Sequence, residues 1–131
     1  MSFLVDTNVL SELARPRPHA GVVSWADALD GFAISVITLD EISFGLALKP
    51  NVRVERWFAA FVETFCRVLD VTGPIARHAG ILRGQLATRG RARTQADMLI
   101  AATAAQHGLT LATRNQKDFD GCGVALFDPF R

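Results

Sequence analysis

Short runs of consecutive apolar residues alternate with longer segments of helical periodicity, and this alternation constrains the fold of the chain more than any other feature. Strands are predicted at residues 2–5, 33–37, 67–71, 109–113 and 124–127. Unbroken apolar runs of this length are typical of parallel strands buried on both faces. Helices are predicted between them at residues 8–14, 19–29, 38–48, 54–65, 72–88 and 95–107, with a short turn or helix at 115–119. Strands separated by helices predict an α/β fold of three layers, α/β/α, with a mainly parallel central sheet.

The length and composition of the chain fit one domain. A chain of 131 residues, half of them hydrophobic, is large enough to build one core and too small for two. We therefore interpret residues 1–131 as a single domain. The formal net charge is +1, so the surface as a whole is not a polycation. Any binding to nucleic acid must therefore depend on a local basic patch.

The cysteines and the N-terminus indicate a cytoplasmic protein. Cys66 and Cys122 lie far apart and lack the paired spacing of a zinc site, so both are interpreted as reduced thiols. The N-terminus carries an acid at Asp6 and lacks the basic segment of a signal peptide. No apolar run approaches the length of a membrane span, and no association with membranes is expected.

Four acidic residues lie where a parallel sheet binds its ligands, at the carboxyl ends of the strands. Asp6 directly follows the first predicted strand, and Asp118 comes shortly after the fourth. Glu41 is expected on the first turn of the helix after the second strand. Asp97 is expected near the start of the helix that leads into the fourth strand. The sequence therefore predicts that these four carboxylates converge on one edge of the sheet.

Each of the four acids also has a simpler interpretation. Asp6 is suited to be the N-cap of a helix starting at Thr7. Residues 38–41 match a capping box in which Glu41 binds the backbone N–H of Thr38, and residues 94–97 have a similar pattern. Asp118 fits an ordinary loop. Capping alone does not require four acids to meet in one cleft, so the joint pattern favours a functional site.

A cleft with four carboxylates requires a cation, because like charges raise one another's pKa and destabilise the fold. Oxygen ligands favour Mg²⁺ or Mn²⁺ over zinc. Magnesium usually retains several waters, so we expect Asp6 and Asp97 to bind it directly and Glu41 and Asp118 to bind directly or through water. Such a site suits hydrolysis of phosphodiester bonds by a metal-activated water, with one metal ion or with two.

Polar and basic residues near the four acids are candidates for supporting roles. Small polar side chains that can orient water or phosphate are Thr7, Asn8, Thr113 and Asn115. Basic side chains that can hold an RNA backbone are Arg89, Arg91, Arg93, Arg114 and Lys117. The alternative roles are helix caps for the polar group and a solvated basic loop for the arginines.

Aromatic residues predict self-association. Phe44, Trp57, Phe58 and Phe61 offer more apolar surface than a domain of this size is expected to bury. A homodimer is therefore expected.

Four segments of the chain resemble the motifs of PIN-domain nucleases, specifically toxins of bacterial VapBC-type toxin–antitoxin pairs and, within these, the FitB-like branch. The segments are 3–10, 41–45, 96–104 and 111–119, and residues 127–130 are also similar to the family. The stretch 91–95 departs from it, because a more apolar, proline-containing segment is expected there. The resemblance covers nearly the whole chain.

The resemblance implies a Mg²⁺- or Mn²⁺-dependent endoribonuclease of three-layer α/β/α fold, with Asp6, Glu41, Asp97 and Asp118 as its acidic residues. It also implies a homodimer. Inhibition is implied through a cognate DNA-binding antitoxin whose tail covers the active site, often with an arginine among the acids.

Two other functions remain open at this point. Phosphatases of the haloacid-dehalogenase type also begin with an aspartate after the first strand. They require a second acid two positions later, where this chain has Asn8. The non-enzymatic alternative is a binding module with the fold of a nuclease and little or no turnover, against which the intact set of four acids argues.

Overall fold

The computed structural model describes residues 2–131, whose strands form one parallel sheet. The strands are β1 (Phe3–Val5), β2 (Phe32–Ser35), β3 (Cys66–Leu69), β4 (Thr110–Ala112) and β5 (Leu126–Phe127). Their order in the sheet is β3-β2-β1-β4-β5, and all four neighbouring pairs are parallel. The predicted α/β fold with a mainly parallel sheet is confirmed.

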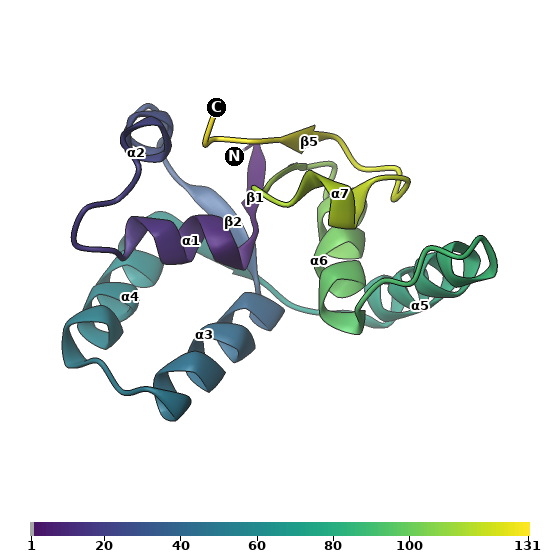
Figure 1. Ribbon diagram of the computed structural model, residues 1–131, viewed down its shortest axis with the longest axis horizontal. Coiled ribbons are helices and arrows are strands. Elements are labelled where there is room, and N and C mark those ends of the chain that lie inside the picture. Colours follow the sequence, from purple (N-terminus) through teal and green to yellow (C-terminus); the bar gives the residue numbers. More distant parts are fainter. Residues whose placement is uncertain (1) are drawn as a thin grey trace.

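Helices cover both faces of this sheet (Figure 1). They are α1 (Thr7–Leu13), α2 (Ala20–Asp27), α3 (Val36–Leu48), α4 (Val52–Phe65), α5 (Gly73–Thr88), α6 (Gln95–Gln106) and α7 (Gln116–Phe119). In Figure 1, α1 to α4 lie on one side of the strands, and α5 and α6 lie on the other. The three predicted layers are present.

The core is divided between the two faces because successive side chains of a strand point in opposite directions. Leu4 of β1 packs in the same cluster as Ile75 of α5 and Met98 of α6. Val5, the next residue, packs with Phe58 of α4 on the other face. This burial on both sides explains why the strands are continuously apolar in sequence.

Helix α3 begins two residues before its predicted start at Thr38, and this corrects the end of the preceding strand. Ser35 is its N-cap, and the Ser35 Oγ accepts a 3.0 Å hydrogen bond from the backbone N–H of Ile37. The strand predicted at 33–37 therefore ends at Ser35, and Val36 and Ile37 are helical. A good cap outweighs the modest preference of β-branched residues for strands.

The other predicted elements are present, with ends displaced by one or two residues. Cys66 and Cys122 are both free thiols, as predicted. None of the helices formed by residues 2–131 is long and apolar enough to cross a bilayer.

The aromatic surface differs from the prediction at Phe58. This side chain is only 8% exposed and belongs to the core under α4. Trp57 and Phe61 are half-buried and stack on each other, with ring centroids 4.5 Å apart. Phe44 is 68% exposed. The expectation of excess apolar surface was therefore wrong for Phe58.

Candidate active site

The order of the strands changes direction at β1. The next strand in the sequence, β2, lies on one side of β1, and β4 lies on the other. In open parallel sheets, the crevice at the carboxyl ends of strands beside such a reversal is the usual place for a ligand. Asp6 directly follows β1, and Thr113 directly follows β4. The Thr113 hydroxyl donates a 2.8 Å hydrogen bond to Oδ2 of Asp6, so the two strand ends are joined at this crevice.

Asp6 is held by three donors. Its Oδ1 accepts from the backbone N–H of Thr7 at 2.8 Å, which makes it the N-cap of α1. Its Oδ2 accepts from Nδ2 of Asn8 at 3.0 Å and from Thr113. Burial raises the pKa of Asp6, and the charge of Glu41 raises it further, while the three hydrogen bonds lower it. The net pKa is raised, so Asp6 is both a helix cap and a carboxylate whose charged form is disfavoured by burial.

Glu41 lies on the second turn of α3, one turn later than predicted. Its Oε1 accepts a 2.6 Å hydrogen bond from the Thr7 hydroxyl, which also lies 3.1 Å from Oγ1 of Thr38. The proposed capping box was wrong, because Ser35 caps α3 and Thr38 is buried inside the helix. The Glu41 side chain instead reaches across to the start of α1.

Asp97 is on the first turn of α6, where Oγ1 of Thr94 caps the helix by accepting from the Asp97 backbone N–H at 3.1 Å. The pKa of Asp97 is raised to about 6. Burial is the main cause, and the charges of Asp6, Asp118 and Glu41 add to it, whereas the bond with Thr94 opposes it. Asp97 therefore lies within electrostatic reach of the other three acids.

Asp118 is exposed on the short helix α7 and is placed by the turn after β4. Its backbone N–H donates to the carbonyl of Asn115 at 3.0 Å. The Asn115 backbone N–H donates to the Thr113 hydroxyl at 3.1 Å, while its side chain makes no capping bond to α7. Asn8 completes this network, because its Oδ1 accepts from the backbone N–H of Arg114 at 3.3 Å.

The five candidate basic residues differ in whether their side chains already contact other groups of the protein. Arg91 forms a 3.1 Å ion pair with Asp120. Arg93 donates to the carbonyl of Lys117 at 3.2 Å, and its Nε is buried without a partner among residues 2–131. The Arg114 guanidinium lies 4.5 Å from the centroid of the Phe130 ring. Arg89 and Lys117 are exposed.

Glu12 is a structurally important acid that sequence reasoning missed. It is 8% exposed on α1, and its carboxylate accepts from the His19 backbone N–H at 2.9 Å and from Arg15 at 3.2 Å. Burial alone would raise the pKa of Glu12, but these hydrogen bonds outweigh it and the pKa is lowered. The only signal in the sequence is the Glu12–Arg15 spacing, which places the pair on one helix face.

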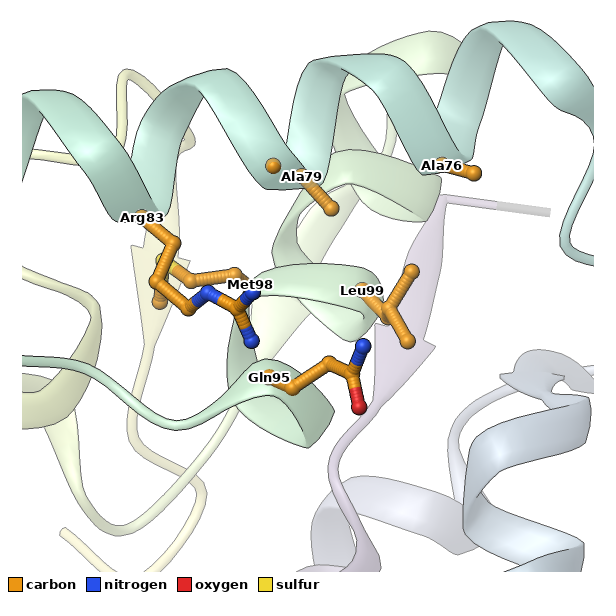
Figure 2. A pocket seen from close by; sticks show the side chains of 7 residues that line it. Ala76, Ala79, Arg83, Gln95, Met98 and Leu99 are labelled. Atoms are coloured by element: carbon orange, nitrogen blue, oxygen red, sulfur yellow. The ribbon is translucent and has the colours of Figure 1, made fainter.

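A separate cavity of about 220 Å³ lies between α5 and α6. Figure 2 shows that the side chains of Arg83, from α5, and Gln95, from α6, both extend into the space between these helices. None of the four acids lines this cavity. It therefore lies beside the site rather than within it.

The donor set fits a hard divalent cation. In residues 2–131, no three side chains of His, Cys, Asp or Glu are grouped closely enough to hold a metal ion by themselves. Mg²⁺ is usually bound by one or two carboxylates and several waters, so a pair such as Asp6 and Asp97 is sufficient. Burial, together with neighbouring carboxylates, raises the pKa of both groups, and a bound cation would offset this cost of holding them charged.

Comparison with known proteins identifies the family. The model of the PIN domain matches residues 3–121. The chain belongs to the PIN domain family. The predicted resemblance is therefore confirmed over most of the length of this PIN domain.

This PIN domain is similar over nearly its whole length to bacterial toxins. Toxin FitB of Neisseria gonorrhoeae is 40% identical, and the alignment covers 97% of this chain and 97% of its own. The VapC ribonuclease Y4jK of Sinorhizobium fredii is 34% identical and covers 97% of this chain and 96% of its own.

Solved structures support the same relationship. The crystal structure of FitAcB from Neisseria gonorrhoeae superposes with a TM-score of 0.83 at 37% identity, over 98% of this chain and 99% of that chain. A toxin–antitoxin complex from Klebsiella pneumoniae gives 0.78 at 30% identity, over 99% of both chains.

Proposed function

We propose that this PIN domain is a Mg²⁺- or Mn²⁺-dependent endoribonuclease and the toxin of a toxin–antitoxin pair. The observation that carries the proposal is the gathering of carboxylates at the reversal of the strand order, where burial and the charges of Asp6, Asp118 and Glu41 raise the pKa of Asp97 to about 6. The relative named VapC ribonuclease supports RNA as the substrate. We expect the whole chain, residues 1–131, to act as one domain in the cytoplasm.

The residues of the site have different tasks in this proposal. A bound divalent ion supplies charge neutralisation at the scissile phosphate and lowers the pKa of a coordinated water. Asp6, fixed by its three donors, and Asp97, fixed on the first turn of α6, provide direct ligands. Glu41, oriented by Thr7, and the exposed Asp118 bind directly or through water.

The polar and basic neighbours position the substrate. Thr113 and Asn8 fix the strand ends around Asp6, which leaves the side chain of Asn115 available to orient a phosphate or water. Lys117, the chain neighbour of Asp118, is exposed and suited to contact the RNA backbone, and Arg89 is exposed at the C-terminal end of α5. Arg91, Arg93 and Arg114 already contact Asp120, the Lys117 carbonyl and the Phe130 ring, so their first role is to hold these segments in place.

An apolar groove beside the carboxylates is suited to an antitoxin. A cavity of about 320 Å³ between α3 and α4 is lined by residues including Ile42, Leu46 and Val62. An adjoining cavity of about 200 Å³ shares Ile42 and Leu46 and is also lined by Thr7 and Glu41. An apolar segment of a cognate, DNA-binding antitoxin can occupy this groove and cover the acids. The related toxin–antitoxin complex supports such a partner.

Self-association is proposed from fewer exposed aromatic residues than the sequence indicated. The exposed Phe44 and the half-buried pair Trp57 and Phe61 remain as apolar surface after Phe58 is assigned to the core. A homodimer that buries part of this surface is expected. Sedimentation at micromolar concentration tests it, and a monomer throughout that range contradicts it.

The alternative functions receive less support. Membership of the PIN domain family does not favour a haloacid-dehalogenase-type phosphatase, and Asn8 stands where that class requires its second acid. Asn8 instead donates a hydrogen bond to Asp6. A binding module without turnover has no need to keep four coupled carboxylates, whose repulsion destabilises the fold.

The decisive experiment measures RNA cleavage by the purified protein on end-labelled single-stranded and structured RNAs. We expect cleavage with Mg²⁺ or Mn²⁺ and none with EDTA. Asp97→Asn should abolish cleavage, whereas Asp40→Asn, an exposed acid on α3, should cleave at the parental rate. Parental cleavage by the Asp97→Asn variant would show that the site is assigned wrongly.

The antitoxin proposal has its own test. The product of a short reading frame adjacent to the gene, if it encodes a DNA-binding protein, should suppress RNA cleavage when mixed with this protein. Leu46→Asp places a charge in the apolar groove and should weaken that suppression without reducing cleavage. Equal suppression of the parent and the variant argues against the groove as the binding site.

A further inference from the structure

Thr38 is a completely buried polar residue that does not cap its helix. It lies on the first turn of α3, which Ser35 already caps. Within residues 2–131, the hydrogen-bond partner of its hydroxyl is the Thr7 hydroxyl at 3.1 Å. Thr7 in turn lies 2.6 Å from Oε1 of Glu41. A chain of two hydroxyls therefore connects the interior of α3 to a carboxylate of the site.

The number of protons fixes the direction of this chain. The Thr7 hydroxyl has one proton, and Glu41 as a carboxylate can only accept. The 2.6 Å distance between them is typical of a hydroxyl that donates to a charged oxygen, so Thr7 uses its one proton to donate a hydrogen bond to Glu41. The other bond, between the two hydroxyls, must then be donated by Thr38 to the oxygen of Thr7. Thr38 thus orients the donor that orients Glu41.

The chain also crosses between separate elements. Thr7 and Glu41 are 34 positions apart, on the helices that follow β1 and β2. Both helices begin at the same edge of the sheet, so a shift of α3 relative to α1 would move Glu41 away from Asp6. The buried Thr38 hydroxyl opposes such a shift, because separating it from Thr7 would leave a polar group without a partner in the interior.

We propose that Thr38 is a positioning residue that acts through Thr7 to hold Glu41 at the carboxylate site and thereby sets the affinity of that site for its divalent cation. This inference rests on the proposed function. Residues that orient metal ligands typically change metal affinity or activity by tenfold or more when they are replaced. We expect an effect of about tenfold at Thr38.

The test compares variants that differ by one hydroxyl. Thr38→Val keeps the shape of the side chain and removes the hydroxyl, whereas Thr38→Ser keeps the hydroxyl. The matched control is Thr103→Val, because Thr103 is also completely buried in a helix but donates at 2.7 Å to the Leu99 carbonyl of that same helix. The first readout is Mn²⁺ affinity by calorimetric titration without RNA, and the second is the kcat and KM of RNA cleavage.

Thr38→Val should bind Mn²⁺ about tenfold more weakly and lose kcat by a similar factor, with KM little changed. Thr38→Ser should restore both quantities, and Thr103→Val should retain the parental values. If Thr38→Val binds Mn²⁺ as tightly as the parent, or if Thr103→Val loses as much affinity as Thr38→Val, the inference is overturned.

A double-mutant cycle tests whether Thr38 acts through Glu41. Glu41→Gln should weaken Mn²⁺ binding, and adding Thr38→Val to it should weaken binding no further. An equal loss from Thr38→Val in both backgrounds overturns the inference but leaves the proposed function in place. Unchanged Mn²⁺ binding and RNA cleavage in Glu41→Gln alone would instead remove Glu41 from the proposed site, and the inference with it.

Discussion

The hydroxyl of Thr113 and the carboxylate of Asp6 meet at 2.8 Å although the residues are 107 positions apart. Each is the first residue after a central strand, so this bond closes the gap between β1 and β4 at the edge where the acids gather. It also lowers the pKa of Asp6 and thereby partly compensates the effect of burial. The position of the site and the stability of the fold thus depend on the same contact.

Removal of that contact should destabilise the protein in a pH-dependent way. Thr113→Val deletes the hydroxyl that stabilises ionised Asp6, so the pKa of Asp6 should rise further. The loss in free energy of unfolding should be about 1–3 kcal/mol at pH 7 and smaller near pH 4, where Asp6 is increasingly protonated. Urea unfolding in EDTA at both pH values measures it, and equal losses at the two would contradict the assignment.

Asp97 should make the metal-free protein less stable as pH rises. Its pKa is about 6 in the folded protein, against an ordinary value of 3.8. A raised pKa means that the folded state holds the proton more tightly, so stability is greatest below the ordinary value and is lost as pH rises towards 6. Asp97→Asn should remove this dependence and raise the melting temperature of the metal-free protein at pH 7. Asp40→Asn should leave the pH profile as in the parent.

Divalent cations should offset the loss of stability that the clustered carboxylates cause. Millimolar Mg²⁺ or Mn²⁺ should raise the melting temperature at pH 7.5, because an ion that binds only the folded state stabilises it. The increase should be smaller at pH 5, where protons compete for Asp97. Thermal unfolding with and without EDTA checks both expectations. No increase with any divalent ion at neutral pH would weigh against a metal site.

Glu12 should support folding rather than chemistry. Glu12→Ala removes the acceptor of the His19 backbone N–H and should cost about 1–3 kcal/mol of unfolding free energy. Glu12→Gln, which keeps an acceptor, should cost less. Because the pKa of Glu12 is lowered in the folded state, its contribution is present above the ordinary value and disappears as pH falls through the lowered one. RNA cleavage by folded Glu12→Gln should equal that of the parent.

Basic residues that contact the RNA backbone should make the affinity for RNA depend on salt concentration. Lys117→Ala should weaken RNA binding and reduce the slope of log affinity against log salt by about 0.7 for one lost phosphate contact. Arg77→Ala, an exposed change on α5, serves as the control and should leave the slope unaltered. Filter binding between 50 and 200 mM salt, a range of about fourfold, is sufficient to distinguish them.

The sequence predicted what depends on local pattern and missed what depends on distant contacts. The apolar periodicities of strands and helices are local, so every element was expected within two residues of its place. Thr38 illustrates the limit, because its spacing to Glu41 fits a capping box and only the earlier start of α3 excludes it.

The burial of individual side chains could not be predicted from local sequence pattern either. Phe58 and its neighbours share one helical spacing, yet only tertiary packing decides which of them enters the core. Glu12 is buried because the chain returns to it at His19. For the candidate site, the sequence predicted the four acids, and their functional role stays a prediction. The hydroxyls that hold Asp6 and Glu41 come from positions 107 and 34 residues away.

The strand order has a consequence for how the protein is made. Strand β1 is synthesised before the other strands of the sheet, yet it pairs with β4, formed by residues 110–112, and β4 pairs with the still later β5. Synthesis proceeds from the N-terminus at about 5–20 residues per second, so Asp97 and Thr113 are added several seconds after Asp6. The four carboxylates therefore cannot come together before the segment from Asp97 to Asp118 has been synthesised, however early Asp6 and Glu41 are made.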